Sequence, residues 1–455
     1  MELEQQTINP ISPSARHGRA RDLFTLWFGT NLMLLTVVTG ALAVTVFRLP
    51  LLWAILSLTL GNLVGGVFMA LHAAQGPTLG VPQMVQTRGQ FGSVGALVVI
   101  CVVVVMYVGF FASNLVLGAE TLRAIAPHLP EPVVILFLGV LSIAGTVLGY
   151  DLIHACTRFV TYASGVAFAL TLLWIAIGHS LPAGLFSRNT VTLQGLLGAI
   201  SVAALWQIAY APYVSDYSRY LPVGSGVRPA FWASYLGSVL GSTLPMIVGT
   251  IIGLLDSGRG LIATLGEMTK GIAPVTFVIF SFAMLTNNAM NVYCGALSTL
   301  TAVQTWRPEW NPGWRARSAV AIILLVIALG LAILGHDSFL ESYTSFILLL
   351  FYLLIPWTAI NLVDYYLVRH GDYDVASFFR HDGGLYGRYN VPALVCYFLG
   401  TLVELPFVST PLYRGPVARA LGDADLSWLV GLAVTSVSYY AFAKRSASPA
   451  SIGAL

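Results

Sequence analysis

Long apolar runs alternate with short polar segments along almost the whole chain. Each run holds about 20 residues, the length with which a helix crosses a hydrocarbon core of about 30 Å. Backbone groups in lipid must find hydrogen bonds within their own segment, so these runs favour helices over open strands. The pattern predicts twelve membrane-spanning helices, at 23–47, 50–74, 94–122, 132–150, 157–178, 193–213, 229–254, 272–303, 318–335, 342–368, 391–409 and 426–443.

The composition agrees with a membrane protein and excludes an ordinary soluble domain. Of the 455 residues, 57% are hydrophobic and only 9% are charged, against about 25% charged residues in an average soluble domain. The longest polar loop, 369–390, is too short for a soluble domain of its own. We therefore expect an all-α integral membrane protein that consists of its membrane domain.

The basic residues indicate the orientation of the helices. An even number of spans places both termini on one side, and 15 of the 22 Lys and Arg residues fall on that side, whereas 7 fall on the other. Cytoplasmic segments carry the excess of basic residues, so we predict a multi-pass protein of the cell inner (plasma) membrane with both termini cytoplasmic. Residues 1–22, 369–390 and 444–455 are then the N-terminal tail, a loop and the C-terminal tail on the cytoplasmic side.

Two predicted spans are interrupted near mid-depth by polar or helix-weakening residues. The first contains Gly-Thr-Asn at 29–31, and the sixth contains Gln207 and Pro212. Broken spans in corresponding places of two halves are typical of transporters built from inverted repeats, in which the breaks line the binding site. We expect a ten-helix core of five plus five helices at 23–368, with two additional helices at 391–443.

The predicted eighth span contains an amide-rich patch, Thr286, Asn287, Asn288 and Asn291. Burying an amide without a partner costs roughly 2–7 kcal/mol, whereas a hydrogen bond between membrane helices returns on average only about 0.6 kcal/mol. A polar cavity for a small solute or ion therefore explains the patch better than packing does. On a helical wheel Thr286 and Asn287 lie beside Asn288 and Asn291, so the first pair suits a cation and the second the edge of a solute.

The sequence contains no motif of a membrane enzyme or receptor. The four cysteines are far apart and lack C-x-x-C spacing, so no disulfide framework and no metal site is indicated. No nucleotide-binding glycine loop or Ser-His-Asp arrangement stands in a suitable context. The lack of a ring of pore-lining charges argues against a channel. A membrane-embedded receptor or enzyme is a remote alternative, and no cofactor is expected.

Four motifs follow one another along the chain. They are GPTLGVPQMVQTRGQFG at 76–92, APYVSDYSRYLP at 211–222, NAMNVYCGAL at 288–297 and NLVDYYLVRHGDYD at 361–374. With these motifs nearly the whole chain resembles the nucleobase:cation symporter-1 family, most closely its purine-cytosine permease branch. The resemblance implies a transporter fold of the amino acid-polyamine-cation type, with the substrate between broken helices one and six and helices three and eight.

The resemblance also implies which residues bind the substrate. In this family one aromatic residue of helix three and one of helix six sandwich a planar ring, while amides bond its edge. Phe110 stands where the family has tryptophan, with Tyr107 about one turn earlier, and Trp206 takes the helix-six position. A nucleobase suits this lining, because its face stacks at roughly 1–3 kcal/mol per ring and its edge offers donors and acceptors to amides. The implied set is Asn31, Phe110, Tyr107, Trp206, Gln207, Asn288 and Asn291.

The family's sodium site transfers to oxygens of helices one and eight. Hard cations take oxygen ligands, and an unwound backbone supplies carbonyls without a carboxylate. Asn287 stands where the family has a second hydroxyl, so its side-chain carbonyl would replace that ligand. The implied ligands are Gly29, Leu32, Ala283, Thr286 and Asn287.

Proton coupling is the competing mechanism. A proton relay within the membrane usually needs Asp, Glu or His inside a span. All eight histidines lie in a terminus, in a loop or near a span end, and only Glu120 and Glu404 lie within or near spans, both toward the outer ends. Sodium is therefore favoured over a proton.

The leading hypothesis is a secondary active transporter that imports a nucleobase, cytosine-like or purine-like, or a related heterocycle by cation symport, with sodium as the coupling ion. The alternative is a proton-coupled symporter of a vitamin-precursor ring such as hydroxymethylpyrimidine or pyridoxine. The expected partners are a small heterocycle, a coupling cation and the lipid bilayer, without nucleic acid.

Overall fold

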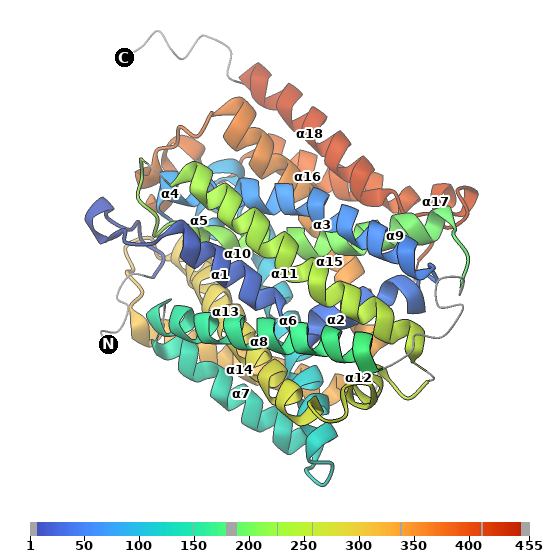
Figure 1. Ribbon diagram of the computed structural model, residues 1–455. Helices are drawn as coiled ribbons and strands as arrows, with labels where there is room; N and C mark the ends of the chain where they lie inside the picture. Colours follow the sequence, from blue (N-terminus) through green and yellow to red (C-terminus); the bar gives the residue numbers. More distant parts are fainter. Residues whose placement is uncertain are drawn as a thin grey trace.

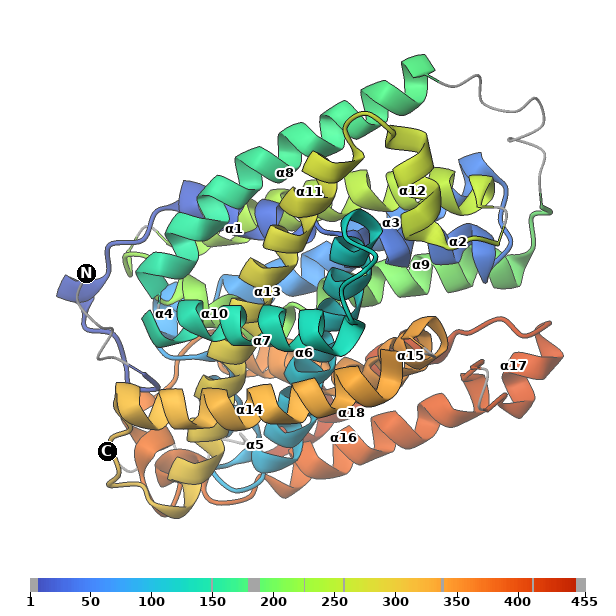
Figure 2. The ribbon, with the colours of Figure 1, turned by 90° about the horizontal axis from the view of Figure 1, so that it is seen from below.

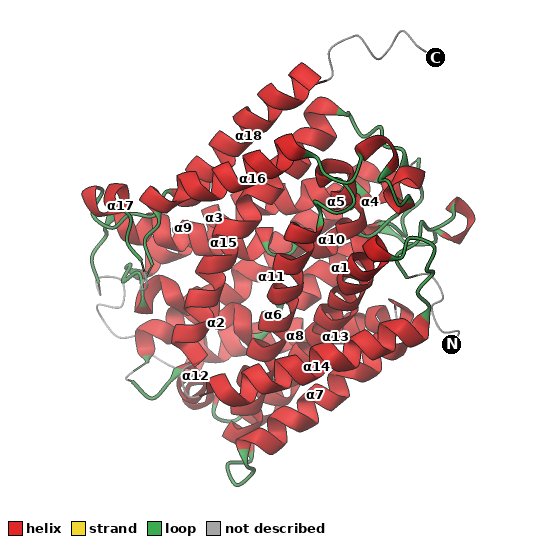
Figure 3. Ribbon diagram, turned by 180° about the vertical axis from the view of Figure 1, so that it is seen from behind, coloured by secondary structure: helices red, strands yellow, loops and turns green. Residues whose placement is uncertain are grey.

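The computed structural model describes residues 7–446 except 149, 179–188, 225, 257, 337–338 and 411–412. Helices dominate the described chain (Figure 3), in which the one β-type pairing is a single bridge between Ser409 and Arg414. The prediction of an all-α protein is confirmed. Most of the predicted C-terminal tail, 447–455, lies outside the described residues.

The first half of the chain contains the bent pair α1 and α2, whose axes differ by 59°. Long helices follow, separated by the short helices α4 and α5. The bounds are α1 Ala20–Asn31, α2 Leu34–Thr45, α3 Leu51–Ala73, α4 Gly76–Leu79, α5 Gln83–Phe91, α6 Leu97–Ile125, α7 Glu131–Leu148 and α8 Tyr150–Gly178.

The second half of the chain also contains a broken pair of helices, α9 and α10. A π-helical turn, Asp364–Val368, continues α15, and short 3-10 turns stand at Pro13–Ala15, Val375–Phe379, Gly384–Tyr386 and Leu405–Phe407. The helices are α9 Leu193–Ile208, α10 Ala211–Ser218, α11 Val227–Leu255, α12 Leu261–Thr269, α13 Ala273–Trp306, α14 Trp314–Gly335, α15 Phe339–Val363, α16 Val391–Glu404, α17 Pro416–Ala420 and α18 Ser427–Ser446.

The twelve predicted spans overlap helices of the described chain, and the first and sixth fall on the broken pairs α1–α2 and α9–α10. By length and apolarity, eight helices of the described chain can cross a membrane, or nine when α1 and α2 are counted as one span. Helices α7 and α16 contribute shorter apolar segments, Glu131–Ile143 and Val391–Phe407. Helix α1 begins and α18 ends at the same end of the bundle, away from α12 and α17 (Figure 1).

The helices pack in two groups, each drawn from both halves of the chain. In one group α11 contacts α1, α2 and α3, and α3 contacts α9; in the other α13 contacts α6, α7, α8 and α14. Glycines let the first group approach closely. A Cβ on Gly249 of α11 would lie 1.8 Å from Val37 O, and one on Gly65 of α3 would lie 2.3 Å from Ala204 O. These contacts place the two broken helices side by side.

Helices α16 and α18 lie along one side of the bundle (Figure 2) and pack against each other and against α15. They lie largely in the segment 391–443, for which we predict two helices in addition to the core. Since α15 also contacts α6 and α9, it links these two helices to the centre of the bundle.

Candidate substrate and cation site

The break between α1 and α2 lies against α9. The Met33 backbone is extended there, with φ −141° and ψ 164°. Side chains support the break, because Asn31 Nδ2 donates to Trp27 O at 2.7 Å and Thr36 Oγ1 donates to Asn31 O at 2.7 Å. The indole Nε1 of Trp206 donates to Asn31 Oδ1 at 2.6 Å, so α9 is tied to this break close to its own end.

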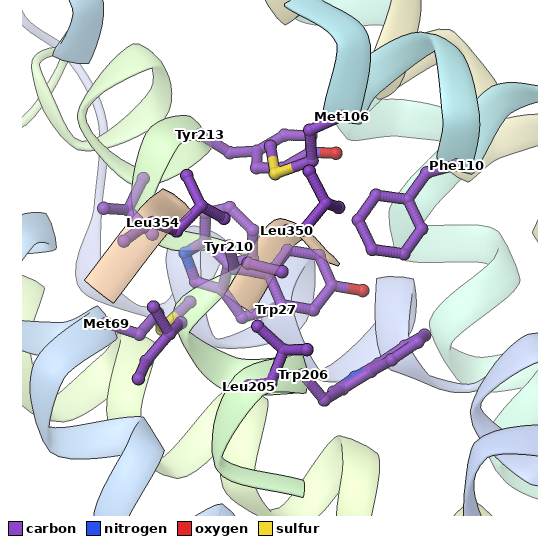
Figure 4. Close-up of a cluster of buried hydrophobic side chains, with 14 of the residues drawn as sticks. Trp27, Met69, Met106, Phe110, Leu205, Trp206, Tyr210, Tyr213, Leu350 and Leu354 are labelled. Carbon is purple, nitrogen blue, oxygen red and sulfur yellow. The ribbon is translucent and has the colours of Figure 1, made fainter. Parts of the chain in front are cut away.

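A cavity adjoins this junction, between the two broken helices, α6 and α13. Phe110, Trp206, Tyr210 and Tyr213 converge on it (Figure 4). It holds about 250 Å³ of empty space, but the part wide enough for a water molecule is only about 10 Å³. A ring-shaped solute therefore requires the side chains to move apart. The lining residues are Met33, Phe110, Trp206, Ala209, Tyr210, Tyr213 and Asn287.

The aromatic rings of the cavity pack edge to face. Phe110 and Trp206 have centroids 6.2 Å apart at 81°, and Trp206 and Tyr210 have centroids 6.0 Å apart at 82°. Such pairs are attractive because the positive edge of one ring meets the negative face of the other. A flat solute could lie between Phe110 and Trp206 only after one of these rings turned its face toward it.

Four asparagines and a tyrosine form a hydrogen-bonded cluster at the α13 wall. Asn114 of α6 donates to Asn287 Oδ1 at 3.1 Å and to Asn288 Oδ1 at 3.0 Å. Asn291 donates to Asn287 Oδ1 at 3.2 Å and accepts from the Tyr213 hydroxyl at 2.6 Å. Asn114 Oδ1 is buried and has no hydrogen-bond partner among the described residues. The cluster therefore has one hydrogen-bond acceptor, Asn114 Oδ1, that none of its own donors uses.

Of the seven expected substrate residues, Phe110 and Trp206 line the cavity, whereas the other five do not. Asn31 bonds Trp206, and Asn288 and Asn291 belong to the asparagine cluster behind Asn287.

Gln207 and Tyr107 bond neighbouring helices. The Gln207 amide donates to Asn62 Oδ1 at 2.8 Å and to Ser242 Oγ at 2.6 Å, which joins α9 to α3 and α11. The Tyr107 hydroxyl donates to Pro212 O at 3.0 Å. In the described conformation both side chains hold helices together beside the cavity.

The α1 side of the expected sodium position is tightly packed. Leu32 N donates to Gly29 O at 3.1 Å where α1 ends. A Cβ on Gly29 would lie 1.9 Å from Thr161 Oγ1 of α8, so only glycine fits. The Thr161 hydroxyl, which donates to Thr25 O at 2.9 Å, thus stands close to the Gly29 backbone.

The α13 side of the same position carries Ala283, Thr286 and Asn287, all buried. Thr286 Oγ1 donates within its own helix, to Phe282 O, at 3.0 Å. Asn287 Nδ2 donates to Thr30 O of α1 at 3.4 Å, while its Oδ1 accepts from the asparagine cluster. Asn287 therefore touches α1 and also lines the aromatic cavity, so one side chain adjoins both expected sites.

Sequence reasoning missed Asn114, Tyr210 and Tyr213. A signal existed for Asn114, which follows Phe110 by four residues and hence lies on the same face of the helix. Tyr210 and Tyr213 flank Pro212 at the break between α9 and α10. Their roles depend on which side of the break turns toward α6 and α13.

Arg88 of α5 secures the end of the bundle at which the chain begins. It donates to Thr301 O at 2.6 Å, Gln304 Oε1 at 3.1 Å and Phe378 O at 2.9 Å, so it joins α5 to α13 and to the loop after α15. Burial lowers the pKa of the Arg88 guanidinium to about 10. The group thus remains charged at neutral pH while it closes this end of the bundle.

Comparison with known proteins decides the family. The family model described as permease for cytosine/purines, uracil, thiamine, allantoin matches residues 10–431. The chain is 38% identical over 452 residues to YxlA of Bacillus subtilis, a purine-cytosine permease candidate, with 98% of this chain and 96% of the relative covered. The chain belongs to the nucleobase:cation symporter-1 family, in its purine-cytosine permease branch.

The permease has further relatives in fungi. It is 23% identical over 467 residues to the purine-cytosine permease FcyB of Emericella nidulans, with 96% of this chain and 88% of the relative covered. It is also 23% identical over 375 residues to the vitamin B6 transporter TPN1 of Saccharomyces cerevisiae, with 76% and 62% covered. The permease is therefore a multi-pass membrane transporter and not an enzyme.

Solved structures of similar fold support the architecture. Mhp1, a nucleobase-cation-symport-1 family transporter in a closed conformation with bromovinylhydantoin bound, matches with a TM-score of 0.78 at 18% identity, covering 98% of this chain and 96% of that chain. Inward-facing Mhp1 matches with a TM-score of 0.73 at 19% identity, covering 98% and 95%. At these identities the likeness concerns the fold, and it confirms the predicted transporter fold.

Proposed function

We propose that the permease imports a nucleobase or a similar planar heterocycle in symport with sodium. The observation that carries this proposal is the meeting of an aromatic cavity, an asparagine cluster and two helix breaks at one point in the bundle. Phe110 and Trp206 supply ring faces, and Asn287 joins the cavity to the amides behind it. Broken helices beside a polar cavity are the typical binding-site architecture of secondary transporters.

Substrate recognition follows from the two kinds of surface. A planar ring between Phe110 and Trp206 gains stacking energy whatever its substituents. Stacking therefore favours planar solutes but does not distinguish one base from another. Hydrogen bonds to the ring edge then distinguish one base from another, because an unmatched buried amide is costly. Asn114, Asn288 and Asn291 are the donors and acceptors that we assign to this edge, together with Asn31 at the α1 break.

Cation coupling would act through Asn287. A sodium ion held by the oxygens of Gly29, Leu32, Ala283, Thr286 and Asn287 would fix the end of α1 against α13. Because Asn287 also lines the cavity, an ion that draws its carbonyl oxygen would rearrange the bonds that Asn114 and Asn291 make to that atom. Sodium binding and substrate binding would thereby depend on each other, as symport requires.

We further propose that the permease resides in the cell inner (plasma) membrane with both termini cytoplasmic. The excess of basic residues on the terminal side supports this orientation. An inward monovalent cation then gains about 2.3 kcal/mol per 100 mV, which suffices to accumulate a neutral ring.

Uptake into proteoliposomes tests the proposal. Radiolabelled cytosine, adenine, hypoxanthine, uracil and pyridoxine are supplied outside, with an inward gradient of sodium, of protons or of neither. We expect accumulation of a nucleobase that requires sodium. Accumulation driven by a proton gradient alone would replace sodium in the mechanism, and failure of every ring under every gradient would refute the proposal.

A further inference from the structure

A buried carboxyl group outside the substrate site has no partner among the described residues. Glu404 ends α16 and is 0% exposed. Both of its carboxylate oxygens are buried without a hydrogen-bond partner in the described part of the chain, and it takes part in none of the ion pairs found there. A charge within the membrane without a partner is expensive, so an intramembrane carboxyl of this kind calls for a ligand.

Two further buried oxygens without a partner among the described residues belong to α16 and α18. They are the Tyr397 hydroxyl of α16 and Thr435 Oγ1 of α18, with side chains 2% and 0% exposed. Tyr397 and Glu404 are seven residues apart, so they lie on one face of α16. The Tyr397 hydroxyl is also close enough to interact electrostatically with the Glu404 carboxyl group.

The contacts of two glycines give the register of this interface. A Cβ on Gly431 of α18 would lie 1.7 Å from Glu404 Oε1, and a Cβ on Gly400 of α16 would lie 2.0 Å from Thr435 Oγ1. The two helices are thus antiparallel, with Glu404 opposite Gly431 and Thr435 opposite Gly400. These two contacts are four residues apart in each helix, which is about one helical turn. The Glu404 carboxylate and the Thr435 hydroxyl therefore lie about one turn apart along the interface.

The electrostatic surroundings of Glu404 are acidic. Asp425, just before α18, is close enough to interact with it electrostatically. Asp425 itself is held by Tyr352 of α15, whose hydroxyl donates to Oδ2 at 2.9 Å, and by the backbone N–H of Ser409 at 2.9 Å. Two neighbouring buried carboxyl groups cannot both be ionised unless a cation lies between them; otherwise one of them takes up a proton. Among the described residues no basic group is close enough to act on Glu404 electrostatically.

We propose that Glu404, Tyr397 and Thr435 bind a sodium ion between α16 and α18, beside α15. Oxygen ligands suit a hard cation. A monovalent ion fits better than a divalent one, because one carboxylate and two hydroxyls provide a single charge, and no group of three His, Cys, Asp or Glu that could hold a metal ion occurs among the described residues. This site is separate from the sodium position proposed at α1 and α13, and it does not depend on what the permease transports.

Through α15 the ion would act on the wall of the substrate cavity. Phe346 of α15 packs against Phe110 with ring centroids 5.5 Å apart at 79°, and Tyr352 of the same helix binds Asp425 beside the proposed site. Pro356, one turn further on, is in contact with Gly400 of α16, since a Cβ there would lie 3.1 Å from Pro356 Cβ. An ion that draws α16 and α18 together would therefore also fix the position of α15.

Equilibrium binding of ²²Na⁺ to the purified full-length permease, with choline as the balancing cation and no substrate, tests the site. We expect the wild type to bind about one ion per chain more than Glu404→Gln, because metal affinity depends on an ionised ligand. Thr435→Val, which removes only the hydroxyl, is expected to weaken that component about tenfold. Size-exclusion elution and circular dichroism like those of the wild type establish that each variant is folded.

Two further variants distinguish an ion bound at Glu404 from an ion bound elsewhere in the permease. Thr286→Val alters the sodium position between α1 and α13, so this variant should still bind the Glu404-dependent ion. That ion should bind whether or not substrate uptake requires sodium. Glu120→Gln removes another carboxyl at an outer helix end and should leave the count unchanged. Equal sodium binding by the wild type and Glu404→Gln would mean that the carboxyl is neutral and would overturn the proposal, as would the absence of saturable binding in the wild type.

Discussion

Trp206 donates its indole N–H to Asn31 Oδ1 at 2.6 Å, and this bond joins the end of α9 to the break between α1 and α2. Asn31 also donates to Trp27 O and to Ser238 Oγ of α11. One asparagine thus connects both broken helices with the helix that packs against them. Any movement of Trp206 toward a substrate would therefore change its hydrogen bond to Asn31 at the α1 break, where the coupling cation is proposed to bind.

Replacing Trp206 by alanine should weaken substrate binding strongly. Loss of one stacking face costs about 1–3 kcal/mol, which corresponds to a rise in KM of roughly 5- to 150-fold in initial-rate uptake. Trp206→Phe keeps a ring but loses the donor to Asn31, so we expect a smaller rise in KM. An unchanged KM in the alanine variant would contradict the placement of the substrate in this cavity.

Replacing Asn114 by alanine should change which bases are transported. The substitution removes the donor to Asn287 and Asn288, and recognition of a ring edge depends on such bonds. We expect the order of competing bases in an uptake-inhibition assay to change.

Asn62→Ala provides the matched control. Asn62 is equally buried but bonds Gln207 and Ser242 away from the cavity. It should lower thermal stability and leave the order of competing bases unchanged. The same order in Asn114→Ala and in the wild type would exclude Asn114 from recognition.

Gly249→Ala should destabilise the bundle. Its Cβ would lie 1.8 Å from Val37 O, so α11 must move away from α2, and overpacking of this kind typically costs about 1–3 kcal/mol. Gly330→Ala in α14 meets nothing within 4 Å and should be neutral or stabilising by about 0.5–1 kcal/mol. Melting temperatures of the detergent-purified variants measure both, and a Gly249→Ala variant as stable as the wild type would refute the close approach.

Thr286→Val should weaken the sodium dependence of uptake while keeping the shape of the side chain. Loss of one oxygen ligand is expected to raise the sodium concentration for half-maximal uptake about tenfold. Thr286→Ser retains the hydroxyl and should behave like the wild type. The two variants have side chains of similar size and are compared by their sodium concentrations for half-maximal uptake. Equal values would show that Thr286 is not a sodium ligand.

The two helix breaks could be predicted because their causes are local. Glycine, asparagine and proline inside long apolar runs weaken a helix wherever it packs, and α1 ends at Asn31 while α10 begins beside Pro212. The apolar runs themselves determine the helices, since length and hydropathy are properties of the segment alone.

Gln207 shows what a local pattern could not reveal. It adjoins Trp206 in sequence, yet Trp206 lines the cavity whereas Gln207 bonds Asn62 and Ser242. Neighbouring residues of a helix point about 100° apart, and which direction leads to the cavity depends on how α9 lies against α3 and α11. Those helices are distant in sequence, so only the packed bundle decides it.

The sequence by itself determined an all-α membrane transporter, its broken helices and its family. The tertiary structure decided which polar residues meet: Asn114 joins the amides of α13, Tyr210 and Tyr213 complete the cavity, and Glu404 is buried against Gly431. The physical reason is that hydropathy acts along a segment, whereas hydrogen bonds and close approach arise between helices, whose rotation and register are set by packing across the whole bundle.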